Sequence, residues 1–292
     1  MLVTNGNIHK KVVNALKYAA FVGNITEVIE ININEVNKPI KTYIAGKTYS
    51  QALSSAKLGL NSKLLTVISG LRKNESDGMI AEAKNNNIDT SHIFISNDID
   101  NDIKIIYKDE NNNKIKEEDI LKGSADALSE DIIVQNEEML KKSSIIVFNT
   151  KINKNVIKKL VQISIDNNIP TIIVPSRPNE ISIIENDIEN IRLIDKVSII
   201  ICNKNQFYQI FGQDVSIEEY LKKYSNKLIL IDDYEVKYFN GNKIIYSKDE
   251  NLRLKEVGAE DIFIGGFVNY FINSENLAEA IKDGLSSLKL EN

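Results

Sequence analysis

The chain has 292 residues, enough for one large α/β domain or two smaller ones with a sizeable core. Its 36 basic and 41 acidic residues leave a formal net charge of −5, which does not imply a broad nucleic-acid-binding face. One cysteine excludes an intramolecular disulfide framework, and with only two histidines a zinc site is not expected. No apolar run is long enough to span a bilayer, and the N-terminus lacks the apolar segment of a signal peptide. We therefore expect a soluble cytoplasmic protein without membrane contact.

Short apolar runs rich in Ile, Val and Leu alternate along the chain with segments of helical spacing. Strands are predicted at 19–31, 64–68, 145–148, 171–174, 197–201 and 227–231. Helices are predicted at 50–58, 77–85, 130–142, 155–166, 217–224, 261–271 and 277–288. Because short β-branched strands that alternate with helices are typically buried on both faces, the pattern predicts a parallel sheet with right-handed crossovers.

A second group of strands is predicted outside this alternation. Residues 103–115 contain the turn sequence Asp-Glu-Asn-Asn-Asn and are expected to form a hairpin. Together with residues near 28–44, the hairpin could form a small accessory sheet over one end of the main domain. The expected organisation is one domain over 1–292, with a small β lid from about 28–44 and 100–118.

The segment 254–267 carries a small-residue turn, an aspartate and a Gly-Gly-Phe sequence, and it leads into an apolar helix. It resembles the Asp-Thr-Thr-Gly-Ala-Gly-Asp-Ala-Phe-x-Gly-Gly-Phe signature of the ribokinase (PfkB) family of sugar and nucleoside kinases. Further similar motifs follow the order of that family, at 22–25, 45–59, 87–93, 123–132 and 203–212. The resemblance implies a ribokinase-like α/β fold, with a parallel central sheet flanked by helices and a small β lid.

In that family, backbone N–H groups at a helix N-terminus hold the transferring phosphate, and the last aspartate of the signature takes a proton from the substrate hydroxyl. The resemblance therefore implies Asp261 as the catalytic base and Gly258, Ala259 and Glu260 as the anion hole. The other implied positions are Gly46, Lys47 and Ser50 for substrate binding, and Asn203, Gln206 and Asp232 for the nucleotide and metal region. ATP and Mg²⁺ are the implied cofactors if the protein is active.

Several positions depart from the family pattern. Glu260 replaces a glycine that permits a close backbone approach, and its charge would lie beside a negative ligand. Val28 and Lys151 stand where sugar-binding carboxylates are expected. Gln206 replaces a glutamate that helps to organise Mg²⁺, and Asp232 replaces a residue that lies beside the ATP phosphates. Affinity for ATP–Mg²⁺ is therefore expected to be weak.

Two functional interpretations remain open. The protein is either an ATP-dependent kinase for a sugar or nucleoside hydroxyl, or a catalytically impaired relative that binds a protein, an assembly or a retained small ligand. The second is favoured, because the changes affect the sugar, metal, nucleotide and anion subsites together. Two local alternatives also remain: Asp261 could serve only as a helix N-cap, and Glu260 could point outward.

Two expectations concern the last part of the sequence. Ribokinases usually continue past the helix that corresponds to 278–288, whereas this sequence stops at Asn292. We therefore expect an exposed apolar surface there that supports self-association or a protein partner. Lys255 stands where the family has an aspartate that binds a monovalent cation, so no K⁺ site is expected.

Overall fold

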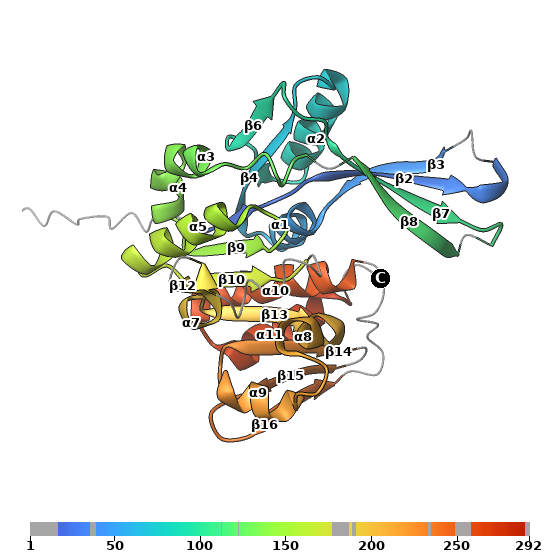
Figure 1. Cartoon of the computed structure of the whole chain (residues 1–292). Helices are drawn as coiled ribbons and strands as arrows, with labels where there is room; N and C mark the ends of the chain where they lie inside the picture. The colour runs from blue at the N-terminus through green and yellow to red at the C-terminus, as the bar shows by residue number, and fades with distance from the viewer. Residues whose placement is uncertain are drawn as a thin grey trace, which may run out of the picture.

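The computed structural model describes residues 17–35, 39–111, 113–121, 123–176, 187–188, 191–232, 235–248 and 258–289. A large sheet with helices on both faces forms the main body, and a separate four-stranded sheet projects from it (Figure 1). The fold class predicted from the sequence is therefore confirmed.

The large sheet has the strand order β16-β15-β14-β13-β10-β9-β1-β4-β5, and β6 also pairs with β4. Its parallel strands are β1 (Tyr18–Val22), β4 (Asn61–Ser69), β5 (Ile88–Asp89), β6 (Ile93–Ser96), β9 (Ile145–Asn149), β10 (Thr171–Val174), β13 (Ile199–Asn203) and β14 (Leu228–Asp232). At one edge β15 (Glu235–Phe239) and β16 (Ile244–Lys248) are antiparallel. These two antiparallel strands extend the predicted parallel sheet, because the connections of two and four residues before β15 and β16 are too short for a parallel crossover.

Helices cover both faces of the large sheet (Figure 1). They are α1 (Lys47–Lys57), α2 (Lys73–Asn85), α3 (Glu130–Gln135), α4 (Glu137–Lys141), α5 (Lys154–Asp166), α7 (Leu193–Lys196), α8 (Lys204–Phe211), α9 (Ile217–Lys223), α10 (Ala259–Ser274) and α11 (Leu277–Ser287). The remaining elements are a 3₁₀ turn, η1 (Ile33–Glu35), and a small pair of strands, β11 (Asp187–Ile188) and β12 (Ile191–Arg192).

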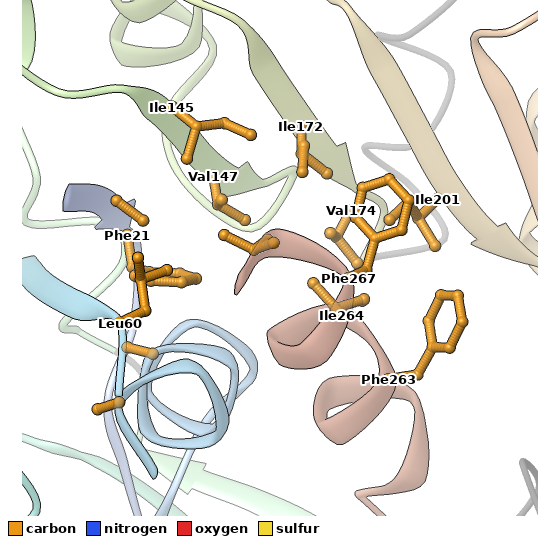
Figure 2. Close-up of a cluster of buried hydrophobic side chains, with 14 of the residues drawn as sticks. Phe21, Leu60, Ile145, Val147, Ile172, Val174, Ile201, Phe263, Ile264 and Phe267 are labelled. Carbon is orange, nitrogen blue, oxygen red and sulfur yellow. The ribbon is translucent and has the colours of Figure 1, made fainter. Parts of the chain in front are cut away.

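The core consists of two apolar layers, one on each face of the large sheet. Alternate residues of one strand enter different layers: Phe21 packs with the layer of α1, α10 and α11, whereas Val22 packs with the layer of α5 and α8. Phe263 and Phe267 of α10 belong to the first layer, and Phe267 lies beside Val174 (Figure 2). This packing holds the N-terminal turn of α10 at the carboxyl edge of the parallel strands.

The first predicted strand is in fact two strands that belong to different sheets. The chain leaves the large sheet at Gly23, where an added Cβ would lie 2.1 Å from Thr48 Oγ1. It then continues as β2 (Thr26–Asn32) in the second sheet. The predicted helix at 130–142 is likewise interrupted, at Asn136, whose side chain donates to Ile132 O at 2.8 Å.

The second sheet, here called the lid sheet, has the order β3-β2-β7-β8, with β3 (Pro39–Ala45), β7 (Asp102–Lys108) and β8 (Lys114–Leu121). Strands β7 and β8 form the hairpin that the sequence predicts. In Figure 1 this sheet projects to the right of the main body. The lid sheet therefore begins just after β1 ends, since β2 follows β1 along the chain.

The expected apolar surface concerns the last helix, α11. Ile281, Leu285 and Leu288 are buried. Leu277 and Ala278, at the start of the helix, are partly exposed and line a pocket with Phe271, so the expected apolar surface stays a prediction there. Residues 290–292 lie outside the described ranges. Within those ranges, every helix is too short or too polar to cross a bilayer.

Candidate functional site

The predicted anion hole lies at the N-terminus of α10, and the backbone of this turn is here called the anion cradle. Gly258 occupies the N-cap with a left-handed φ of 89°, and it has no side chain that could accept the first amide groups. Its carbonyl accepts hydrogen bonds from the N–H groups of Asp261 and Ile262, at 3.0 and 3.1 Å. The preceding amides at such a helix start lack helical partners and lie at the positive end of the dipole. The backbone of this turn therefore remains suited to an anion.

The side chain of Glu260 places a carboxylate beside this cradle. Lys47 Nζ, from the first turn of α1, lies 2.6 Å from Glu260 Oε1, and only about a fifth of each side chain is exposed (23% and 20%). Asn203 Nδ2 lies 3.5 Å from the other carboxylate oxygen. Glu260 thus extends between the start of α1 and the start of α8. The alternative in which Glu260 points outward is wrong.

Asp261 is held from the opposite helix by a residue that sequence reasoning missed. Gln51 Nε2 donates to Asp261 Oδ1 at 2.9 Å, and the Gln51 side chain is buried. Gln51 lies four residues after Lys47 on α1, so both side chains occupy the same face of the helix. This spacing of four residues is the sequence signal that could have identified Gln51 as a site residue. The alternative in which Asp261 is the N-cap is wrong, because Gly258 occupies that position.

Burial raises the pKa of Asp261 to about 6, an effect that Lys47 opposes and Glu260 reinforces, while the Gln51 hydrogen bond opposes it. Burial lowers the pKa of Lys47, but the carboxylates of Glu260 and Asp261 outweigh this effect, so the net shift is upward. Lys47 therefore remains an ammonium at neutral pH. With a pKa of about 6, Asp261 changes between its protonated and its ionised form at a pH about one unit below neutrality.

The loop before α1 approaches β1 closely. Gly46 has a φ of 106°, and an added Cβ would lie 3.0 Å from Asn24 Nδ2 and 3.1 Å from Thr26 N. Only glycine fits this position without strain. The N–H of Ser50 donates to Gly46 O at 2.8 Å, as in any helix start. Of the three predicted substrate-binding residues, Lys47 is the one whose side chain reaches Glu260.

The predicted metal-organising position, Gln206, has a structural role in this chain. It forms a capping box with Asn203, since each side chain accepts the other residue's N–H group, at 2.8 and 3.0 Å. Gln206 Nε2 also donates to Pro175 O at 2.7 Å. A glutamate could not make that last contact. Both ends of the Gln206 amide are therefore engaged with protein atoms.

Asp232 lies at the carboxyl end of β14 and shares a lysine with a second carboxylate. Lys237 Nζ lies 3.2 Å from the Asp232 carboxylate and 2.7 Å from Glu235 Oε1. The repulsion between Asp232 and ATP phosphates that the sequence predicts is therefore reduced. This ion pair was not predicted, because Lys237 belongs to the antiparallel edge strand that sequence reasoning missed.

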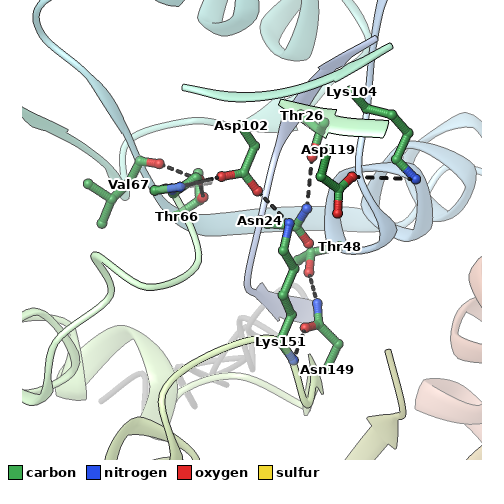
Figure 3. A network of polar contacts seen from close by, with 12 residues as sticks. Asn24, Thr26, Thr48, Thr66, Val67, Asp102, Lys104, Asp119, Asn149 and Lys151 are labelled. Carbon is green, nitrogen blue, oxygen red and sulfur yellow. Dashed lines mark hydrogen bonds and ion pairs between the residues drawn. The ribbon is translucent and has the colours of Figure 1, made fainter. Parts of the chain in front are cut away.

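A polar network joins the lid sheet to the carboxyl edge of the large sheet (Figure 3). Lys151 Nζ, from the loop after β9, lies 2.6 Å from Asp102 Oδ2 at the start of β7. Lys151 therefore binds a lid carboxylate rather than extending into solvent. Val28, the other altered sugar position, is buried within the lid sheet, between Tyr43 and Lys104 of the neighbouring strands.

One buried acceptor in this region lacks a partner. Asn24 Nδ2 donates to Thr26 Oγ1 at 2.9 Å, but Asn24 Oδ1 has no hydrogen-bond partner among the described residues. Buried carbonyl oxygens of this kind normally accept a hydrogen bond. Asn24 lies beside Gly46, at the point where the chain passes from the large sheet to the lid sheet.

The family resemblance implies a site for ATP–Mg²⁺, but the residues at the corresponding positions do not suit this ligand. A carboxylate lies beside the anion cradle, and the amide at the metal-organising position is bound to protein atoms at both ends. The described residues include no cluster of three or more His, Cys, Asp or Glu side chains that could hold a metal ion. Lys255, at the predicted cation position, lies outside the described ranges.

The parallel sheet, the lid sheet and the cradle at α10 define a ribokinase-like α/β protein. The family description "pfkB family carbohydrate kinase" matches residues 17–291. The chain belongs to this family. Comparison with curated proteins gives no match.

Solved structures support the same fold. The chain is similar to Sa239, with a TM-score of 0.80 and 17% identity, covering 94% of this chain and 93% of the other. It is also similar to the Arabidopsis thaliana ribokinase complexed with ribose and ATP, with a TM-score of 0.74 and 14% identity, covering 94% and 92%. The adenosine kinase of Sinorhizobium meliloti matches with a TM-score of 0.74 and 11% identity, covering 94% and 93%.

Proposed function

We propose that this chain is a catalytically impaired member of the pfkB family that binds a small hydroxyl-bearing ligand, of the sugar or nucleoside class, without efficient phosphoryl transfer. The observation that carries this proposal is the ion pair between Lys47 and Glu260, at 2.6 Å. It connects the loop implied in substrate binding to the turn implied in phosphate binding. The Glu260 carboxylate therefore occupies the position next to Lys47 and to the backbone amides at the start of α10, which a transferring phosphate would need as donors.

The energetic consequence is unfavourable for a triphosphate. A phosphate entering this cradle would have to displace Glu260 from Lys47, and the displaced carboxylate would remain nearby. Two like charges about 5 Å apart cost on the order of several kcal/mol at an effective dielectric near 20. Pairing of the phosphate with the Lys47 ammonium would offset this cost only in part, because the same contact with Glu260 is lost.

We propose a small ligand of this class rather than a protein partner because the chain belongs to a family of carbohydrate kinases and keeps the fold of that family.

Calorimetry of ATP–Mg²⁺ binding tests the proposal. We expect no binding in the micromolar range for the wild type and at least a tenfold gain in affinity for E260G, which restores the family residue and frees Lys47. E279Q is the matched control, since Glu279 forms an exposed pair with Lys282 on α11. Micromolar binding by the wild type, or an equal gain in E279Q, would contradict the proposal.

An active kinase is the second candidate, and one observation favours it. Asp261 has a pKa raised to about 6 and is oriented by Gln51, which is what a base working near neutral pH requires. Phosphorylation of ribose, fructose or adenosine by the wild type, abolished in D261N, would establish this candidate and overturn the first.

A further inference from the structure

The chain enters and leaves the β7–β8 half of the lid sheet at one buried carboxylate. Asp102 is the first residue of β7, and its side chain is 1% exposed. Its Oδ1 atom accepts the N–H groups of Gly123 at 2.8 Å and Ser124 at 2.9 Å, just after β8 ends. Asp102 therefore fastens the outgoing chain of the lid hairpin to its incoming chain.

The preceding residue belongs to the main body. Asn101 Oδ1 accepts the N–H of Ser69, at the end of β4, at 2.8 Å, and Asn101 Nδ2 donates to Ser76 Oγ of α2 at 3.0 Å. The incoming chain is thus anchored up to residue 101. From Asp102 onward the chain pairs with β2 of the lid sheet, so the junction between the main body and this half of the lid, here called the hinge, lies between residues 101 and 102. A contact of the Asp102 side chain with the main body therefore acts at the hinge.

Lys151 supplies that contact from the other side of the hinge. Its Nζ atom lies 2.6 Å from Asp102 Oδ2, and 15% of its side chain is exposed. Its own N–H donates to Asn149 Oδ1 at 2.8 Å, and Asn149 Nδ2 donates to Thr48 Oγ1 at 2.6 Å. A continuous series of polar contacts therefore runs from the lid hinge to the first turn of α1, next to Lys47 (Figure 3).

Breaking the ion pair between Asp102 and Lys151 would cost free energy, because water cannot readily replace Lys151 there. Asp102 is almost completely buried, and turning the hairpin away from Lys151 would leave its carboxylate without a cation in a poorly solvated position. The two backbone amides satisfy only one of the two carboxylate oxygens. The orientation with the ion pair intact is therefore strongly preferred over others.

We propose that the Asp102–Lys151 ion pair is a latch that holds the lid at one angle to the large sheet whether or not a ligand is bound. The angle of the lid is then a property of the protein alone, and ligand binding does not need to drive closure. This inference does not depend on the proposed function, since a latched lid is compatible with binding alone and with catalysis.

Electron–electron distance measurements between two spin labels test the latch. The labels are placed at I115C in β8 and K222C in α9, both at exposed positions, while the native Cys202 is buried and does not react. We expect a single narrow distance distribution for the labelled wild type. D102N removes the charge and keeps an oxygen that can accept the Gly123 and Ser124 amides, and we expect its distribution to broaden at least twofold. K151M should show the same broadening, and K151R should restore the narrow distribution.

The matched control is a pair of similar length that lies entirely within the lid sheet. Lys108 Nζ lies 2.7 Å from Glu30 Oε2, and both side chains are mostly buried. K108M should leave the distribution narrow, since it does not touch the hinge. A narrow distribution in both D102N and K151M would overturn the proposal. Equal broadening in K108M, or a wild-type distribution that narrows or shifts with added ribose or ATP–Mg²⁺, would also overturn it.

Discussion

Two ion pairs of the same length, 2.6 Å, have different surroundings in this protein. Asp102 is 1% exposed and accepts two backbone amides besides Lys151. Glu260 is 20% exposed, and its only other described hydrogen bond is the long contact with Asn203. In the first pair, Lys151 stabilises the charge of the Asp102 carboxylate, which is too deeply buried to be solvated by water. In the second pair the carboxylate keeps some contact with solvent, so the main consequence of this pair concerns ligands.

The largest expected effect is on the buried pair. K151M should lower the free energy of unfolding by about 3–5 kcal/mol, because it leaves Asp102 charged and buried without a cation. K73M is the control, since Lys73 and Asp77 form an exposed pair on α2, and it should change stability by about 0.5 kcal/mol or less. Urea denaturation measures both. Similar losses in the two variants would mean that burial does not distinguish these pairs.

The loop that carries Lys47 provides the next test. G46A should cost about 1–3 kcal/mol, because the left-handed φ of 106° and the neighbouring Asn24 and Thr26 atoms both oppose a Cβ. G78A on α2 is the control, since an added Cβ there meets open space, and it should stabilise the protein by about 0.5–1 kcal/mol. Thermal and urea unfolding of the two variants should therefore move in opposite directions.

A pH series on Asp261 tests the electrostatics beside the cradle. Its pKa is raised in the folded state to about 6, so its contribution to stability is complete below the unfolded pKa and is lost as pH rises through about 6. D261N removes this dependence. Relative to the wild type, D261N should gain about 1–3 kcal/mol between pH 4 and pH 7, since a shift of one pKa unit corresponds to about 1.4 kcal/mol.

The relevant measurement is the difference in unfolding free energy between D261N and the wild type at each pH. A difference that is constant with pH, or that favours the wild type as pH rises, would show that Asp261 is not held in an environment that disfavours its charge. Q51L is a useful companion variant, since loss of the Gln51 hydrogen bond should raise the Asp261 pKa further.

The smallest expected effect is on the partly exposed pair. E260Q should lower the free energy of unfolding by about 1 kcal/mol or less, because Lys47 retains the field of Asp261 and both side chains reach solvent. This value contrasts directly with that of K151M. A loss in E260Q as large as that in K151M would mean that the cradle pair is structural, and would remove the distinction between the two regions.

Much of the fold could be read from local patterns. The buried strands at 64–68, 145–148 and 171–174 are found at these places with small changes of boundary, because short β-branched runs bounded by helical segments have few alternatives. The antiparallel edge was missed, since β15 and β16 have mixed polarity and no motif. Helix α8 was missed because its start signal, the capping box of Asn203 and Gln206, was interpreted as a metal-organising motif.

The candidate site was predicted only in part. The order of motifs drew attention to Asp261, Glu260 and Lys47, which the structure brings together. It could not identify Gln51 as the partner of Asp261, nor the engagement of Gln206 with Pro175. The residue type at a motif position indicates which chemistry is possible there. Its contact partners depend on the directions of the side chains, which a sequence motif does not contain.

The sequence by itself therefore determined the family, the alternation of strands and helices, and the residues that gather near the start of α10. Tertiary structure alone decided which charges meet: Lys47 and Glu260 are 213 positions apart, and Asp102 and Lys151 are 49 apart. The physical reason is the parallel sheet. Crossovers bring the carboxyl ends of distant strands to one edge, so loops far apart in sequence become neighbours there. Local periodicity reports which face of an element is buried, but it carries no information about which polar side chain will face another across that edge.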